Sequence, residues 1–342
     1  MLLSIYCLAG LVTFATSLQL PDTKLGNPKD FGSLPEEKIG GFIVQLKDGA
    51  GLTRRSDIHA SFHKRAALNL KYKVRVNFRN PALFYGVSIQ LDQNKTVSEV
   101  QTILDKIPEV VAVFPNIKVL KPVPAQKNGN LTAVAAQESW PTKPSGPFTP
   151  VDDSPKLPKI RGGADIANTL KMADVDKLHA LGIKGKGIKI GIIDSGVDYR
   201  HPSLGGGFGP GFKVAGGYAF VEDGWTGDVP IESPDPLATC FAGGHGTHTA
   251  GWYLKTHPLG ALLTVSGTIV AQDPPNVGFG LTGVAPEASL YAYRVFGCVA
   301  DSTYTDIIMN AMIKAAEDKV VCFVSDAGYK VTNDSRMSSA CL

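Results

Sequence analysis

Residues 188–194, Ile-Lys-Ile-Gly-Ile-Ile-Asp, decide the fold of this chain. Their apolar side chains are almost continuous, which is typical of a strand buried on both faces of a parallel sheet. Asp194 ends the run. Doubly wound folds gather their functional groups at the carboxyl ends of such strands, so Asp194 is a candidate site residue. A helix-capping aspartate is the alternative at this position.

The segments around this strand alternate in type. A short helix is predicted over residues 175–181, a second strand over residues 288–296 and an amphipathic helix over residues 305–317. Alternation of strands and helices indicates an α/β fold with a doubly wound parallel sheet, which we assign to residues 171–318.

A second motif lies at residues 243–251, Gly-Gly-His-Gly-Thr-His-Thr-Ala-Gly. Glycines around His245 permit a close backbone approach, and His248 follows three residues later. A zinc-binding pair needs a spacing of four and a glutamate, and neither is present. The motif therefore favours a packed, non-ligating His248 over a metal-binding pair.

The first third of the chain has another pattern. Alternating strands and two helices follow one another in the order β-α-β-β-α-β, which predicts a ferredoxin-like α+β domain over residues 41–121. The strands are expected at residues 41–46, 73–78, 85–91 and 110–115, and the helices at residues 56–68 and 97–107.

The remaining segments indicate export and processing. Residues 1–17 combine a short apolar run with a small-x-small site, as in a cleaved signal peptide, and residues 18–40 form a polar linker. Residues 122–158 hold eight prolines, so residues 122–170 are interpreted as a linker that a protease would cut. We therefore expect a secreted, extracellular protein with no membrane span.

Five cysteines occur, and Cys7 would leave with the signal peptide. The other four permit three disulfide pairings, between which the sequence does not choose; they are Cys240, Cys298, Cys322 and Cys341. Three tripeptides that begin at Asn94, Asn130 and Asn333 fit N-glycosylation and are compatible with secretion.

The motifs at Asp194 and His245, together with residues 283–288, resemble those of the subtilases, the peptidase S8 family of subtilisin-like serine proteases. The order Asp, His, then Ser is that of subtilisin. The resemblance implies that His245 is the general base, that Asp194 holds it in the right tautomer, and that His248 has no catalytic role. Residues 42–121 similarly resemble the family's inhibitor I9-type propeptide, whose C-terminal strand would lie in the active-site cleft.

The resemblance also implies a serine nucleophile and an asparagine oxyanion donor, which the sequence does not supply. The serine would come about 150 residues after the histidine, but 97 residues follow His245. Three serines in the tail lack the expected Gly-Thr before them, and we expect none of them to be the nucleophile; they are Ser335, Ser338 and Ser339.

Two segments depart from the family pattern. Residues 252–267 place Pro258 and Gly260 where the helix after His245 should continue, and a proline inside a helix costs about 3 kcal/mol. Residues 319–342 are interpreted as a divergent tail. Unspliced introns and a genuine truncated paralogue are both compatible with these departures.

Composition sets the remaining expectations. The net charge of +3 excludes the basic excess of a nucleic-acid-binding protein, although residues 41–121 carry about +7 and residues 171–318 about −5. We expect a monomeric zymogen of a hydrolase that acts on protein or peptide substrates and is bound by its own propeptide. No cofactor is expected, and a structural calcium ion cannot be read from this sequence. A protease inhibitor or folding chaperone that acts through residues 41–121 is the alternative function.

Overall fold

The structure is a computed structural model that describes residues 39–47, 57–92, 95–121, 170–239, 245–247, 269–272 and 282–325. The predicted signal peptide, the proline-rich linker, the insertion at residues 252–267 and His248 lie outside these residues, as do the three tail serines. We call residues 39–121 the N-terminal lobe and residues 170–325 the C-terminal lobe.

The N-terminal lobe contains every helix and strand that the sequence predicts for it, in the predicted order. They are β1 (Ile39–Leu46), α3 (Ile58–Ala66), β2 (Tyr72–Asn80), β3 (Phe84–Leu91), α4 (Val97–Leu104) and β4 (Val110–Leu120). Both helices begin at side-chain caps, Asp57 for α3 and a Thr96–Glu99 capping box for α4. Both helices pack on one face of the sheet and enclose a core that includes Val44, Phe62 and Leu104.

The strands of this lobe form an antiparallel sheet in the order β2-β3-β1-β4, to which the C-terminal lobe adds β8 (Ser302–Tyr304). β4 ends at Leu120, beyond the predicted end at residue 115. Pro115 hides this extension in the sequence, because a proline argues against a continuing strand. Residues 116–120 remain extended because Ile117 pairs with Ile39 and residues 118–120 pair with β8.

The C-terminal lobe is built on a parallel sheet, which confirms the predicted α/β class for this part of the chain. The strands lie in the order β6-β7-β5-β9, and β5 is paired on both sides. The elements are α6 (Val175–Ala180), β5 (Lys189–Asp194), the 3-10 turn η2 (Pro202–Leu204), β6 (Val214–Ala219), β7 (Ser289–Arg294), α8 (Thr305–Glu317) and β9 (Cys322–Ser325).

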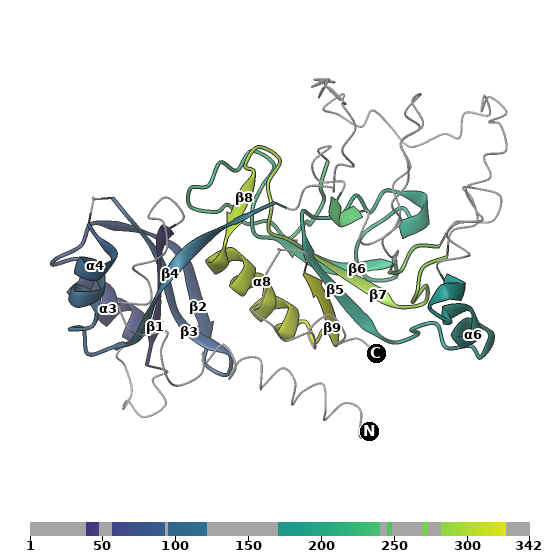
Figure 1. The fold of residues 1–342 in the computed structure, drawn as a ribbon, viewed down its shortest axis with the longest axis horizontal. Helices are drawn as coiled ribbons and strands as arrows, with labels where there is room; N and C mark the ends of the chain where they lie inside the picture. The colour runs from purple at the N-terminus through teal and green to yellow at the C-terminus, as the bar shows by residue number, and fades with distance from the viewer. Residues whose placement is uncertain are drawn as a thin grey trace.

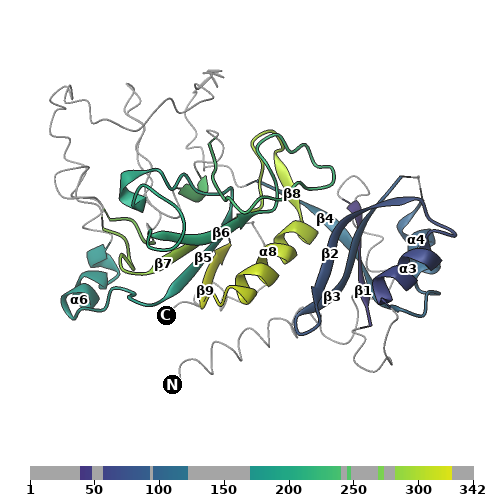
Figure 2. The same ribbon diagram turned by 180° about the vertical axis from the view of Figure 1, so that it is seen from behind.

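Helix α8 lies between the two sheets (Figures 1 and 2). On one side Ile307, Ile308 and Ala311 pack with residues of β5 and β7. On the other side Met309 and Ile313 pack against the face of the N-terminal sheet that α3 and α4 leave free. One helix therefore serves two cores, and we call the contact between the two lobes along α8 and β8 the lobe interface.

Two further findings bear on the sequence predictions. Cys298 is disulfide-bonded, and the other cysteine side chains lie outside those described. None of the helices in the described part of the chain has the length and apolar character that crossing a bilayer requires.

Candidate active site

Asp194 lies at the carboxyl end of β5, where the sequence predicts it. The strand is buried along most of its length, and Asp194 itself is 2% exposed. Its Oδ1 accepts a hydrogen bond of 2.5 Å from the backbone nitrogen of Ser195. This backbone hydrogen bond orients the carboxylate and leaves Oδ2 available for a different partner.

That second oxygen is bonded to His245. The distance between Asp194 Oδ2 and His245 Nδ1 is 2.7 Å, although 51 residues separate the two along the chain. A carboxylate only accepts hydrogen bonds, so this bond requires a proton on Nδ1 and leaves Nε2 as the acceptor of a neutral ring. The His245 side chain is 22% exposed, against 2% for Asp194. The pair therefore has a buried orienting acid and a histidine open to solvent.

The turn after Asp194 holds the histidine segment in place. Ser195 Oγ accepts a hydrogen bond of 3.0 Å from Gly246 N, and Thr247 Oγ1 accepts one of 2.8 Å from Asp198 N. Residues 245–247 are helical. A Cβ atom on Gly246 would lie 2.2 Å from the carbonyl oxygen of Gly196, so only glycine permits this approach.

Sequence reasoning missed one charged residue beside the pair. Arg294 ends β7 opposite Asp194 in the parallel register and is buried. Its Nη1 donates to the carbonyl of Leu237 at 2.8 Å, and its guanidinium is ion-paired with Asp223. A charged residue near the end of an apolar strand was the available signal. Arg294 fixes the loops around the site.

The N-terminal lobe reaches toward this site through the end of β4. The Lys121 backbone nitrogen donates to the carbonyl of Asp301 at 2.7 Å, and its Nζ donates to the carbonyl of Gly297 at 3.0 Å. Burial lowers the pKa of Lys121, nearby Arg294 lowers it further, and Asp194 raises it. The lysine thus lies within electrostatic range of the Asp194 carboxylate.

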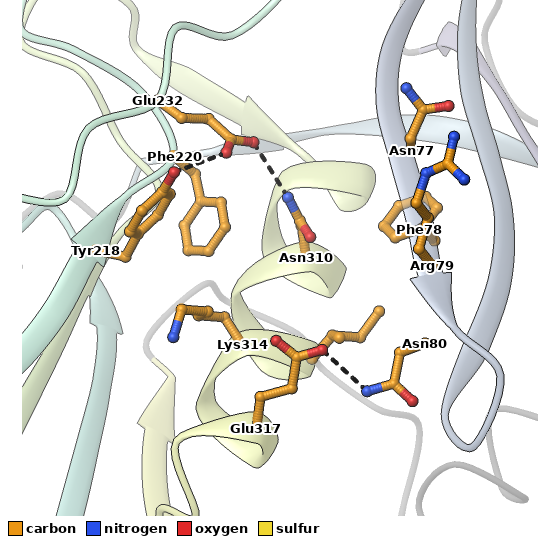
Figure 3. Close-up of a pocket in the computed structure, with 11 residues that line it drawn as sticks. Asn77, Phe78, Arg79, Asn80, Tyr218, Phe220, Glu232, Asn310, Lys314 and Glu317 are labelled. Carbon is orange, nitrogen blue, oxygen red and sulfur yellow. Dashed lines mark hydrogen bonds between the residues drawn. The ribbon is translucent and has the colours of Figure 1, made fainter.

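A cavity of about 290 Å³ opens on the lobe interface, between β2, α8 and β6. Figure 3 shows its polar contacts, in which Tyr218 and Asn310 donate to Glu232 and Asn80 donates to Glu317. Neither Asp194 nor His245 lines it. The cavity is therefore a feature of the lobe interface, separate from the candidate active site.

Among the described residues, no group of three or more His, Cys, Asp or Glu side chains could hold a metal ion. The site itself contains an Asp–His pair at the carboxyl end of a parallel sheet. Such a pair can take a proton from a hydroxyl and return it to a leaving group.

Residues 185–338 match the subtilase family. The subtilase region thus includes both Asp194 and His245. It also includes β9, which falls in the segment that the sequence predicts to be a divergent tail. This part of the chain is therefore similar to a subtilase domain of the peptidase S8 type.

Three bacterial proteases are similar to part of this chain. The minor extracellular protease Vpr of Bacillus subtilis is 34% identical over 47% of this chain and 16% of its own length. The major intracellular serine protease of the same organism is 31% identical over 46% and 39%, respectively. Subtilisin E is 34% identical over 38% and 24%. The alignments thus span well under half the length of these relatives.

Proposed function

We propose that this chain derives from the precursor of a subtilisin-like serine endopeptidase, with His245 as general base and Asp194 as the residue that orients it. The observation that carries the proposal is the 2.7 Å bond between Asp194 and His245 within the subtilase region. His245 Nε2 would take the proton of a serine hydroxyl during attack on the peptide carbonyl and then give it to the leaving amine. Asp194 would stabilise the imidazolium that forms in between.

We further propose that none of the 342 residues acts as the nucleophile. The proposal rests on local sequence, since Ser335, Ser338 and Ser339 lack the Gly-Thr that is expected before a subtilisin-type nucleophile. Without the serine, only the small acceleration from binding and partial electrostatics would remain.

The N-terminal lobe is proposed to be a ferredoxin-like, inhibitor-type propeptide. Its sheet packs on α8, and residues 118–120 of β4 pair with β8 as an added antiparallel strand. Strand addition takes affinity from backbone hydrogen bonds and specificity from side-chain pockets. Residues 1–17 would export the precursor, and a cut within residues 122–170 would separate the two lobes. We also propose that the enzyme acts on protein or peptide substrates and that it is a monomer.

The test is to sequence the messenger RNA that encodes residues 245–342 and to express the protein that this message encodes. If that protein supplies a serine, it should cleave peptide substrates and react with an active-site fluorophosphonate. His245→Ala should then lower kcat by at least about 10⁴-fold. The control is His179→Ala, because His179 is a half-buried residue of α6 that bonds the carbonyl of Val284, outside the Asp194–His245 pair.

Two outcomes would overturn the assignment. Rapid fluorophosphonate labelling of the 342-residue chain would show that a nucleophile is present after all. Peptide cleavage that survives His245→Ala within tenfold would remove His245 from the mechanism.

The second candidate function is a non-catalytic inhibitor or folding chaperone, favoured by the separate core of the N-terminal lobe. Residues 42–121 would then be titrated against a mature subtilase. Inhibition at tens of micromolar or below, with an on-rate that falls as salt is added, would support an inhibitor. No inhibition in that range corresponds to about 6 kcal/mol of binding or less and would leave only the chaperone role.

A further inference from the structure

A buried ion pair crosses the lobe interface. Arg75 Nε donates to Asp306 Oδ2 at 2.8 Å, and both side chains are 0% exposed. Arg75 lies where the register of β2 against β3 shifts between Val74 and Val76. Such a bulge redirects one side chain of a strand.

The carboxylate of Asp306 has partners from both lobes. Ser88 Oγ of β3 donates to the same Oδ2 at 2.7 Å, and the backbone nitrogen of Ile307 donates to Oδ1 at 2.9 Å. Asp306 also lies in the first turn of α8, where the helix dipole favours a negative charge. The site on α8 is therefore built to hold a carboxylate facing the N-terminal lobe.

The guanidinium of Arg75 is held mainly by groups of the C-terminal lobe. Its Nη1 donates to the carbonyls of Gly227 and Asp228 at 3.0 and 3.2 Å, and it also lies 3.4 Å from Gln90 Oε1 of its own lobe. Its Cζ lies 4.7 Å from the centre of the Tyr304 ring. An arginine in this position fits a pocket formed by a carboxylate, two carbonyls and an aromatic face.

Burial decides what such a pair contributes. Removing two charges from water offsets most of their attraction, so a complete buried pair adds little stability. Removing one partner leaves a buried charge without its counter-ion and strongly disfavours the complex. Specificity arises from this kind of penalty against the wrong partner.

We propose that Arg75 and Asp306 form the selectivity contact that matches the N-terminal lobe to its own subtilase domain. The partner that this lobe accepts carries a carboxylate in the first turn of the helix equivalent to α8, beside two carbonyls placed to accept from a guanidinium. A subtilase surface with a neutral or basic residue at that position is rejected. The inference rests on the proposed function, because it names the partner that the proposed propeptide recognises.

The experiment measures amide hydrogen exchange in the full 342-residue chain. Two amides report on docking, Ile117 N–H, which donates to Thr305 Oγ1, and Lys121 N–H, which donates to the carbonyl of Asp301. Amides of the β1–β3 ladder report on the N-terminal lobe itself, since local opening and global unfolding exchange at different rates. The variants are Arg75→Met, Asp306→Asn and the double variant. Arg79→Met, at an exposed arginine on the same strand, is the control.

We expect each single variant to speed exchange of the two docking amides by about 100-fold or more, with the β1–β3 amides unchanged. The double variant should exchange more slowly than either single variant, because no unpaired charge remains. Arg79→Met should match the wild type within threefold.

The proposal is contradicted if the double variant exchanges as fast as either single variant or faster. It is also contradicted if the single variants expose the β1–β3 amides equally, since the pair would then serve folding of the lobe. Exchange requires no catalysis, so this result is independent of whether the protein encoded by the message cleaves peptides.

Discussion

The side-chain oxygen of Asn116 lies 3.0 Å from the backbone nitrogen of Asp306, 190 residues further along the chain. The same oxygen accepts a 3.0 Å bond from Thr305 Oγ1. The N-cap residue of α8, Tyr304, makes no side-chain capping bond of its own. The N-terminal lobe therefore caps the helix on which it packs.

Asn116→Ala should lower the free energy of unfolding by about 1 kcal/mol, because the first turn of α8 loses an acceptor. Urea unfolding of the full chain measures the change. Asn77→Ala is the matched control, since Asn77 is exposed on β2 of the same lobe. The control should cost less than about 0.5 kcal/mol. Equal losses in the two variants would show that Asn116 does not act as a cap.

His59 makes the stability of the N-terminal lobe depend on pH. The side chain is 2% exposed, and its ring lies edge-on to Tyr85. Burial lowers the pKa of His59, and Arg79 lowers it further, while Asp57 raises it. Burial also lowers the pKa of neighbouring His63. Because the folded pKa lies below the unfolded value of about 6.5, the unfolded chain binds more protons as the pH falls. The free energy of unfolding is therefore undiminished by His59 above about pH 6.5 and declines as the pH falls below that value.

We expect the free energy of unfolding to fall between pH 7.5 and pH 5.5, and His59→Phe to reduce that fall. His63 should retain part of the pH dependence in this variant. His179→Gln, on α6 of the C-terminal lobe, is the matched histidine control. Urea unfolding at the two pH values provides the measurement, and an identical slope in His59→Phe and the wild type would rule out the assignment.

Gly246→Ala should separate the histidine segment from the turn after Asp194. The added Cβ would lie 2.2 Å from the carbonyl oxygen of Gly196, so backbone must move. Overpacking of this kind costs about 2 kcal/mol. Gly224→Ala is the control, because a Cβ there meets nothing within 4 Å. Thermal unfolding compares the two, and similar melting temperatures would contradict the tight approach seen at Gly246.

Much of this fold could be predicted from the sequence, because the hydrophobic pattern that specifies each helix or strand lies within that short segment. α8 was predicted over residues 305–317, the bounds that the structure shows, since its apolar side chains repeat at helical spacing. The strand that ends at Asp194 was equally clear, since a continuous apolar run has few alternatives. β6 was missed. Its sequence contains Gly216 and Gly217, which weaken a strand signal, and Gly217 adopts a φ of 148° against the backbone of Ala292.

The lobe interface could not be predicted in the same way. The pairing of β4 with β8 and the bond between Arg75 and Asp306 join residues more than 180 positions apart. From sequence alone, a charged residue in a strand is expected to face solvent, because a distant partner cannot be identified. The opposite net charges of residues 41–121 and 171–318 favour attraction between the two lobes. Among the described residues, the structure places two ion pairs at the lobe interface, Arg75–Asp306 and the more exposed Lys118–Asp301.

The central claim is that Asp194 holds His245 in the tautomer that a general base requires. Nitrogen-15 NMR of histidine-labelled full chain tests it most directly, because the two ring nitrogens differ in shift according to which one carries the proton. Above the histidine pKa, the account predicts a proton on Nδ1 in the wild type and a shift toward the Nε2–H form in Asp194→Asn, whose amide can donate to Nδ1. A wild-type ring protonated on Nε2, or one whose tautomer is the same in Asp194→Asn, would contradict the account.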